Sequence, residues 1–177
     1  MSEQAHAGLV MIYTGNGKGK TTAALGLALR AVGHGRRVLM IQFMKGGDEY
    51  GELRAARMLP GFEIVQKGLP TFVQRGNPAP ADLRLAAEGL QTARDALTGG
   101  EWDLVILDEI NVALDYGLLT LDDVVKLLEL RRQDTDMVLT GRAAHPELIR
   151  RADMVSEVVE IKHHYRQGVP ARKGIEY

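Results

Sequence analysis

The stretch from Leu9 to Val32, "LVMIYTGNGKGKTTAALGLALRAV", constrains the fold more than any other part of the sequence. It begins with a short aliphatic run, continues through closely spaced glycines to a Gly-Lys-Thr-Thr sequence, and ends in a helical pattern. A glycine-rich loop between a strand and a helix points successive backbone N–H groups into one concavity, and the helix N-terminus adds positive potential there. The order of strand, loop and helix therefore predicts a βα unit that cradles phosphate.

Strand-length apolar runs alternate with helical patterns along the rest of the chain. The runs are "RVLMIQF", "FEIVQ", "DLVILD", "DMVLT" and "VSEVVEI". This rhythm predicts an α/β, P-loop NTPase-like fold, with a mainly parallel sheet covered by helices on both faces. Thr120 followed by Asp123 predicts a capping box at the start of one helix. Because 177 residues with 45% hydrophobic content match the size of one core, we expect a single domain over residues 1–177.

The composition argues against several classes of function. Basic and acidic residues nearly cancel, 22 against 23, without a long run of one sign, so we expect neither nucleic-acid nor membrane binding. The chain contains no cysteine, which rules out disulfides, thiolate catalysis and cysteine-based metal sites. The longest apolar runs are strand-length, and "MSEQAHA" at the start lacks the basic and apolar regions of a signal peptide. We therefore predict a soluble, cytoplasmic protein.

The loop is a variant of the usual GxxxxGK[ST] pattern. Thr14 stands five positions before Gly19, and the first glycine comes one place later, at Gly15. Lys20 is predicted to reach phosphate oxygens, and Thr21 is predicted to ligate Mg²⁺ through its hydroxyl. Further candidates for contact with the polyphosphate are Lys18 and Thr22.

Two other strand ends carry charged residues. "DLVILDEIN" places Asp108 and Glu109 after a strand, where they are predicted to hold Mg²⁺ beside the loop, directly or through water. Without the loop, such a pair would be typical of a solvated strand end or a helix cap. "VLTGR" ends in Arg142, whose guanidinium is predicted to neutralise a leaving polyphosphate, with a surface salt bridge as the alternative.

These residues leave the reaction open. Phosphoryl transfer by a small-molecule kinase, hydrolysis by an ATPase or regulatory ATP-binding module, and attack on the ribose of the nucleotide all remain. A carboxylate next to a Mg²⁺-binding aspartate can position water, which fits hydrolysis. The sequence offers a motor no recruitment domain, second NTPase lobe or basic nucleic-acid face, which weighs against the ATPase.

Five segments together resemble the P-loop type of ATP:corrinoid adenosyltransferase, from about Gly8 to Tyr177. The segments are "TGNGKGKTTAALGLALRAVGHG", "VLMIQFMKG", "WDLVILDEINVALDYGLL", "VLTGRAAHPELIRRADMVSEV" and "GVPARKGIEY". The resemblance implies that a Co(I) corrinoid attacks the ribose 5′ carbon of ATP and that triphosphate leaves whole. Because Co(I) is a strong nucleophile with no proton to lose, such an enzyme needs no catalytic serine, cysteine or histidine base.

The resemblance also implies roles for individual residues. Residues 16–22 would contact the phosphates, Thr21 and Glu109 would serve Mg²⁺, and Arg30 would contact the nucleotide, although the pattern alone favours an exposed helix residue there. The predicted catalytic residues are Lys20 and Arg142, which would neutralise the departing triphosphate, and Glu109, which would serve the Mg²⁺ that does the same. The predicted substrate-binding residues are Gly15, Asn16, Gly17, Lys18, Gly19, Lys20, Thr21, Thr22, Arg30 and Phe72.

The family further implies reversed binding of ATP in its loop, a homodimer and a flavodoxin-like reductase that supplies the electron. In relatives an N-terminal segment can cover the active site. Only about seven residues precede the similarity, so we expect that cover to be short or absent. The last residues, "QGVPARKGIEY", are predicted to form an extended tail.

An apolar surface that displaces the axial ligands of cobalt is implied as well. The family uses a GxGFxW-like segment, which corresponds here to "GLPTFVQ". Phe72 matches the phenylalanine and is predicted to line the corrinoid face, with core packing as the alternative, whereas Gln74 replaces the tryptophan. Trp102 is predicted to pack. We expect His163 and His164 to point to opposite sides of an extended segment, as a surface pair. Structural roles are predicted for His34 and His145.

Overall fold

The computed structural model describes residues 7–177, and the predicted N-terminal cover would involve residues 1–6, which lie outside the described residues. Six parallel strands form one sheet in the order β3-β2-β4-β5-β1-β6. Their bounds are β1 Val10–Thr14, β2 Val38–Phe43, β3 Phe62–Lys67, β4 Leu104–Asp108, β5 Asp136–Thr140 and β6 Met154–Glu157. The predicted parallel sheet is confirmed.

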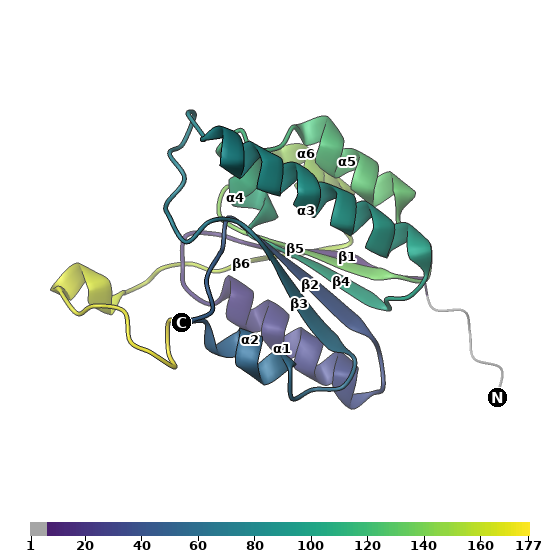
Figure 1. Ribbon diagram of the computed structural model, residues 1–177, viewed down its shortest axis with the longest axis horizontal. Coiled ribbons are helices and arrows are strands. Elements are labelled where there is room, and N and C mark those ends of the chain that lie inside the picture. Colours follow the sequence, from purple (N-terminus) through teal and green to yellow (C-terminus); the bar gives the residue numbers. More distant parts are fainter. Residues whose placement is uncertain (1–6) are drawn as a thin grey trace.

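Helices cover both faces of this sheet, as the sequence predicts (Figure 1). One face carries α1 (Lys20–Gly33) and α2 (Gly51–Ala56), and the other carries α3 (Pro80–Gly99), α4 (Ile110–Asp115), α5 (Leu121–Leu130) and α6 (Pro146–Arg151). A short 3₁₀ helix, η1 (His164–Gln167), follows β6. Within residues 7–177, no helix is both long enough and apolar enough to span a bilayer.

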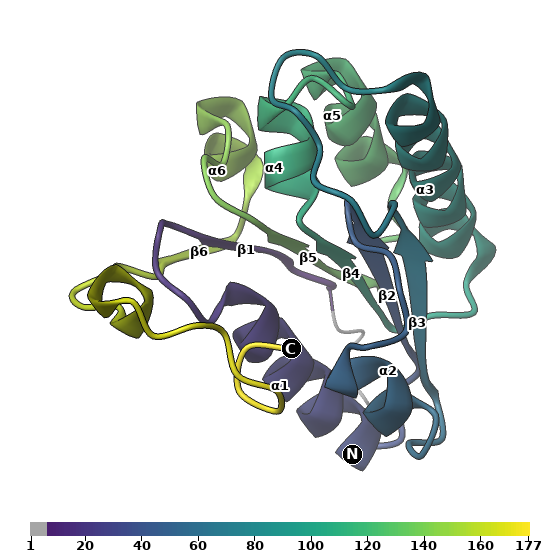
Figure 2. The ribbon, with the colours of Figure 1, turned by 60° about the vertical axis from the view of Figure 1, so that its left-hand side comes forward.

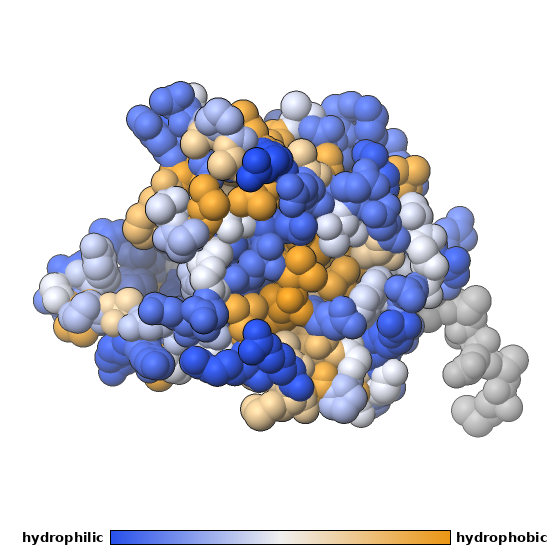
Figure 3. Space-filling view, viewed as in Figure 1, coloured by the Kyte–Doolittle hydropathy of each residue, from blue (hydrophilic) through white to orange (hydrophobic). Residues whose placement is uncertain are grey.

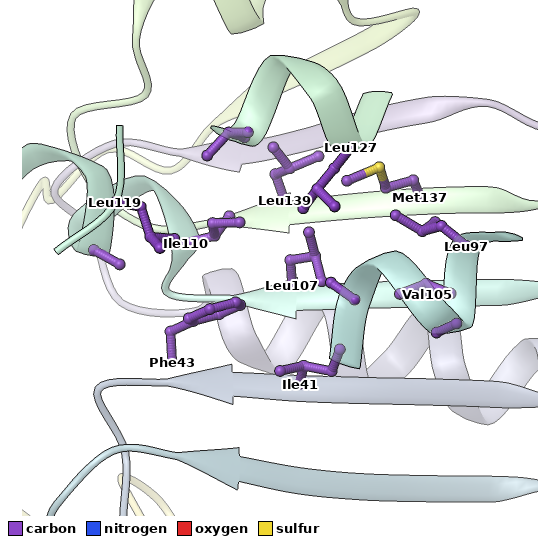
Figure 4. Packing of buried hydrophobic residues seen from close by; sticks show 14 of the residues in the cluster. Ile41, Phe43, Leu97, Val105, Leu107, Ile110, Leu119, Leu127, Met137 and Leu139 are labelled. Atoms are coloured by element: carbon purple, nitrogen blue, oxygen red, sulfur yellow. The ribbon is translucent and has the colours of Figure 1, made fainter. Parts of the chain in front are cut away.

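Each strand feeds two hydrophobic cores because its side chains alternate between the faces. In β2, Val38 and Met40 pack under α1 and α2, whereas Leu39, Ile41 and Phe43 pack against the four-helix layer (Figure 4). All six residues of β2 are buried, and five of them are apolar, with Gln42 as the buried polar residue. Each of the apolar side chains contributes about 1.5–3 kcal/mol to folding.

Two helix ends follow the sequence signals. The capping box of α5 is confirmed, because Thr120 Oγ1 accepts a hydrogen bond from the Asp123 backbone at 3.2 Å and Asp123 Oδ2 accepts one from the Thr120 backbone at 3.0 Å. The longest helix, α3, begins with Pro80 and ends before Gly100, which has a φ of 75°. Between the two helical layers, apolar surface gathers on the face shown in Figure 3, where the partly buried edge strand β3 lies.

Candidate active site

The glycine loop between β1 and α1 is held against a segment from the other end of the chain. Gly17 N donates to Val158 O at 2.7 Å, and Val158 N donates to Thr14 O at 2.8 Å. A Cβ on Gly17 would lie 2.8 Å from Val158 O, and one on Gly15 would lie 2.5 Å from it. The loop glycines are therefore required by close packing of residues 158–159, in addition to their role in shaping a phosphate cradle. No local sequence pattern indicates this contact.

Lys20 begins α1 and folds back across the loop. Its ammonium donates to Gly15 O at 2.8 Å and to Gly17 O at 2.7 Å, and the residue is only 7% exposed. Burial lowers the pKa of Lys20 below its ordinary value, the negative charge of Glu109 opposes that shift, and Arg142 reinforces it. The loop thus holds a buried cation at the position where the sequence predicts phosphate oxygens.

Asp108 ends β4 with a fully buried carboxylate. Thr21 and Thr140 donate their hydroxyls to Oδ1 at 2.9 and 2.7 Å, and Lys45 donates to Oδ2 at 2.7 Å. A buried carboxylate needs such partners because its desolvation is costly. The predicted placement of this carboxylate beside the loop is confirmed by its contact with Thr21.

Glu109 reverses the chain between β4 and α4. Its φ of 62° lies in the left-handed region, which costs a non-glycine residue about 1–3 kcal/mol. The Glu109 backbone N–H donates to Thr140 Oγ1 at 2.9 Å, which helps to hold this turn. Burial and the nearby charge of Asp108 raise the pKa of Glu109, while Lys45, Lys20 and Arg142 oppose the rise.

A cavity of about 940 Å³ opens beside the loop and brings most of the predicted site residues together. Glu109, Arg142 and Phe72 line this cavity with residues 17–22. No ion pair of Arg142 occurs within residues 7–177, so the surface salt bridge is not its role there. Phe72 is fully exposed, which makes the core-packing alternative wrong. Gln74 is exposed and does not line the cavity.

The structure does not bring Arg30 to the loop. Arg30 lies in the last turn of α1, about 15 Å along the helix axis from Lys20 at the ordinary rise per residue. It lines a separate cavity of about 480 Å³, together with His34, Arg36 and Asp136. A contact between Arg30 and a nucleotide in the loop of the same chain is therefore not supported, because the helix carries the residue away from the phosphates.

Of the predictions for the other aromatic and histidine residues, some are confirmed and one is wrong. Trp102 packs against the core, with the Arg37 guanidinium 4.9 Å from its ring centre, as predicted. His145 caps α6, because its Nδ1 accepts from Glu147 N at 3.1 Å, and this structural role is also confirmed. The expectation for His163 and His164 is wrong. Their rings stack with centres 4.7 Å apart because the chain turns into η1 between them, and His163 lines the cavity.

The C-terminal segment is not an extended tail. Arg172 N donates to Glu176 Oε2 at 2.7 Å, and Glu176 N donates to Arg172 O at 2.9 Å, which closes a turn. His164 Nε2 lies 3.5 Å from Glu176 Oε1 and links this turn to η1. The turn lies beside α1 in both ribbon views, and residues 174–177 line the cavity (Figures 1 and 2). Apolar periodicity gives no signal for this turn, because hydrogen bonds and an ion pair hold it.

Lys45 is a second site residue that sequence reasoning missed. It follows β2, whose neighbour in the sheet is β4, and Gln42 lies opposite Asp108 in the parallel register. The carboxyl ends of these two strands therefore meet at the same edge of the sheet. The available signal was a charged residue just after a buried strand. It predicts a contact with Asp108 only when the strand order, which places β2 beside β4, is known.

The oxygen atoms at this edge fit a Mg²⁺ ion that is only partly coordinated by protein, rather than a metal enclosed by protein ligands. Thr21 supplies a hydroxyl, and Asp108 and Glu109 supply carboxylates. Among residues 7–177, no group of three or more His, Asp or Glu side chains is arranged to hold a metal ion. Mg²⁺ commonly takes one or two protein carboxylates and completes its octahedron with phosphate oxygens and water. The residues present therefore fit a metal that arrives with a nucleotide.

A family model and individual relatives of this chain agree on one family. The family model described as "ATP:corrinoid adenosyltransferase BtuR/CobO/CobP" matches residues 6–177. A corrinoid adenosyltransferase of Escherichia coli (strain K12) is 37% identical over 175 residues, which cover 98% of this chain and 88% of the relative. Corrinoid adenosyltransferase CobA of Salmonella typhimurium is 36% identical with the same coverage. A corrinoid adenosyltransferase of Pseudomonas aeruginosa is 35% identical over 96% of this chain and 84% of the relative.

Solved structures share the fold at low identity. The RadB recombinase superposes with a TM-score of 0.55 at 12% identity, covering 89% of this chain and 77% of that chain. The flagellar accessory protein FlaH from Methanocaldococcus jannaschii gives 0.57 at 14% identity, covering 86% and 71%. These likenesses support the predicted P-loop NTPase-like fold and carry no functional detail.

Proposed function

The chain belongs to the ATP:corrinoid adenosyltransferase family, an enzyme family that adenosylates corrinoids with ATP, and from this premise we propose how its own residues perform the reaction. The observation that carries the proposal is that one cavity is lined both by the glycine loop and by the exposed ring of Phe72. Adenosyl transfer requires a phosphate cradle and an apolar corrinoid surface in one place, so that cobalt and the ribose carbon can meet.

The loop binds the triphosphate that becomes the leaving group. The Lys20 ammonium turns from the carbonyls of Gly15 and Gly17 to phosphate oxygens, and loop N–H groups complete the cradle. Arg142 lines the same cavity and adds a second positive charge. As the electron pair of Co(I) forms a bond to the 5′ carbon, the carbon–oxygen bond breaks and its electrons leave with triphosphate. Fixed positive groups stabilise that developing charge.

Mg²⁺ would be held by Thr21, Asp108 and Glu109. When bound, it supplies further neutralisation of the triphosphate. The hydroxyl of Thr21 and the carboxylate of Asp108 already lie within hydrogen-bond distance of one another, so little rearrangement of the backbone is needed to bring them to one ion. Burial and the charge of Asp108 raise the pKa of Glu109, and a cation bound beside it would favour its charged form.

Phe72 would face the corrinoid ring and keep water and axial bases away from cobalt. Its ring is fully exposed and lines the same cavity as the glycine loop, so it is free to contact a bound ligand. Tyr116 and the turn at residues 174–177 line the same cavity. Gln74, exposed and outside the cavity lining, does not take over the role of the family tryptophan.

The assembly of the enzyme is part of the same proposal. We infer a single domain over residues 1–177 that forms a homodimer, resides in the cytoplasm and receives electrons from a flavodoxin-like reductase, without nucleic-acid or membrane partners. The formal net charge of −1 fits the last point. Support for a dimer comes from exposed apolar residues after β6, with Val159 65%, Ile161 94% and Tyr165 72% exposed.

Products of the reaction test the proposed function. Purified protein is mixed with ATP, Mg²⁺ and chemically reduced cobalamin without oxygen, and the loss of Co(I) absorbance is followed. Light-sensitive adenosylcobalamin with an equal amount of triphosphate is expected. Persistent Co(I) with formation of ADP would overturn the proposal, and a phosphorylated acceptor or free phosphate would then identify a kinase or an ATPase.

A further inference from the structure

Lys45 occupies the position between the atoms that would hold Mg²⁺. Its Nζ lies 2.7 Å from Asp108 Oδ2 and 3.4 Å from Thr21 Oγ1. The Lys45 side chain is 18% exposed and lines the same cavity as the loop. An ammonium therefore already bridges two of the three groups that the proposed metal site uses.

A bare divalent cation would meet little net attraction there. The carboxylates of Asp108 and Glu109 lie among the positive charges of Lys45, Lys20 and Arg142, so two negative charges are already opposed by three positive ones. A second cation within about 4 Å of the Lys45 ammonium would be repelled, and the repulsion is strong where solvent is partly excluded. Mg²⁺ and the Lys45 ammonium therefore compete for Asp108 Oδ2.

The ammonium remains charged in this position. Burial by itself would lower the pKa of Lys45, but the charge of Asp108 and the hydrogen bond to it raise the pKa above its ordinary value. Lys45 also carries its charge on a flexible four-carbon stem, so it can change partners without moving the backbone. Lys20, in contrast, donates to two loop carbonyls and makes no hydrogen bond to Asp108 within residues 7–177.

We propose that Lys45 is the counter-cation of Asp108 in the free enzyme, and that it transfers its ammonium to the triphosphate when Mg²⁺ and ATP bind together. The inference rests on the proposed Mg²⁺·ATP site, but it holds for whichever bond of ATP is broken. Its consequence is an order of binding: Mg²⁺ does not enter alone, because only the nucleotide offers the displaced ammonium another anion. Lys45 is thus a substrate-contacting residue that also positions the metal.

Isothermal titration calorimetry with the full chain tests this inference. Magnesium chloride alone and ATP with magnesium are each titrated into the wild type and into Lys45→Met, without corrinoid. The wild type is expected to bind Mg²⁺ only with ATP. The variant is expected to bind Mg²⁺ alone at least about tenfold more tightly than the wild type and to bind ATP about ten- to a hundredfold more weakly, as for loss of one hydrogen bond to a charged group.

Lys67→Met is the matched control. Lys67 ends the neighbouring strand β3, its side chain is 20% exposed, and its Nζ pairs with Glu88 at 3.5 Å, outside the cavity lining. This control should bind both ligands as the wild type does. If circular dichroism shows that Lys45→Met is unfolded, Lys45→Gln takes its place, since an amide still donates to Asp108 without a charge.

Two results would overturn the inference. One is unchanged binding of Mg²⁺ and ATP in the Lys45 variants, which would leave Lys45 a structural partner of Asp108. The other is binding of Mg²⁺ alone to the wild type with the same affinity as in the presence of ATP. Failure of the proposed function would give a different result. It would change the reaction products but would leave the binding of Mg²⁺ dependent on ATP.

Discussion

Phe72 exposes its whole ring to solvent, so its contribution to binding can be separated from stability. Phe72→Ala is expected to leave the unfolding temperature unchanged and to lower the rate with base-containing cobalamin by about tenfold or more, since a buried aromatic contact contributes a few kcal/mol. The loss should be smaller with a corrinoid that lacks the lower base, because no base then needs to be displaced. Anaerobic single-turnover rates with both corrinoids measure this difference.

Met58→Ala serves as the control for Phe72, because Met58 is also an exposed apolar residue, at 77%, but does not line the cavity. Its rate with either corrinoid should match that of the wild type. An unchanged rate of Phe72→Ala with base-containing cobalamin would show that Phe72 does not form the corrinoid surface.

Glu109 predicts a dependence of stability on pH. Its pKa is raised from the ordinary 4.5 by burial and by Asp108, so the folded state binds more protons than the unfolded state as pH rises through this range. Burying the charged form costs free energy, and the wild type therefore loses stability from this group as pH rises above 4.5 and through the higher folded-state pKa. Glu109→Gln removes that cost.

Without Mg²⁺, the glutamine variant is expected to unfold at a temperature a few degrees above the wild type at neutral pH, and the difference should shrink as pH falls below the ordinary value. Thermal unfolding in the presence of a chelator measures it. The variant should also bind Mg²⁺·ATP more weakly. A wild type that is more stable than Glu109→Gln at neutral pH would contradict the conclusion that the charged form of Glu109 destabilises the folded enzyme.

At the scale of elements, the sequence pattern predicted the strands and helices better than it predicted which side chains meet at the site. Short apolar runs predicted the strands, and helical patterns together with the cap at Thr120 predicted the long helices, because local residues decide these elements. The contact of the loop with Val158 joins residues that are far apart in the sequence, and no local pattern encodes it. Lys45 and the turn near Glu176 were missed for the same reason, since the strand order and the path after β6 place them at the site.

The contact between the loop and residues 158–159 gives a prediction about Gly17. Gly17→Ala would place a methyl group 2.8 Å from Val158 O, so the segment must shift, and we expect a loss of about 1–3 kcal/mol of stability together with weaker binding of ATP. Chemical denaturation and calorimetry measure the two effects.

Gly26→Ala is the matched control within the next helix. A Cβ at Gly26 meets no atom within 4 Å, and alanine is favoured over glycine in a helix interior by about 1 kcal/mol. This variant is expected to be more stable than the wild type and to bind ATP unchanged. Equal effects of the two substitutions would mean that residues 158–159 do not restrain the loop.

For the whole molecule, the site lies where parallel sheets usually bind ligands. The loop follows β1, Asp108 ends β4, Arg142 follows β5 and Lys45 follows β2, so the charged groups gather at the carboxyl edge of the sheet. The turn at residues 174–177 adds a wall that comes from the other end of the sequence. One cavity thereby places phosphate-binding groups and an apolar surface together, which is the requirement for moving the adenosyl group rather than a phosphoryl group.

The fate of the ribose 5′ oxygen tests this account most directly. ATP labelled with ¹⁸O at the bridge between the 5′ carbon and the α-phosphorus is incubated with the enzyme, Mg²⁺ and Co(I) cobalamin. The ¹⁸O content of each product is then measured by mass spectrometry. Cleavage of the carbon–oxygen bond predicts that all of the label leaves with triphosphate and that adenosylcobalamin carries none. Label retained in ADP would show that a phosphorus–oxygen bond had broken instead, and would contradict the account.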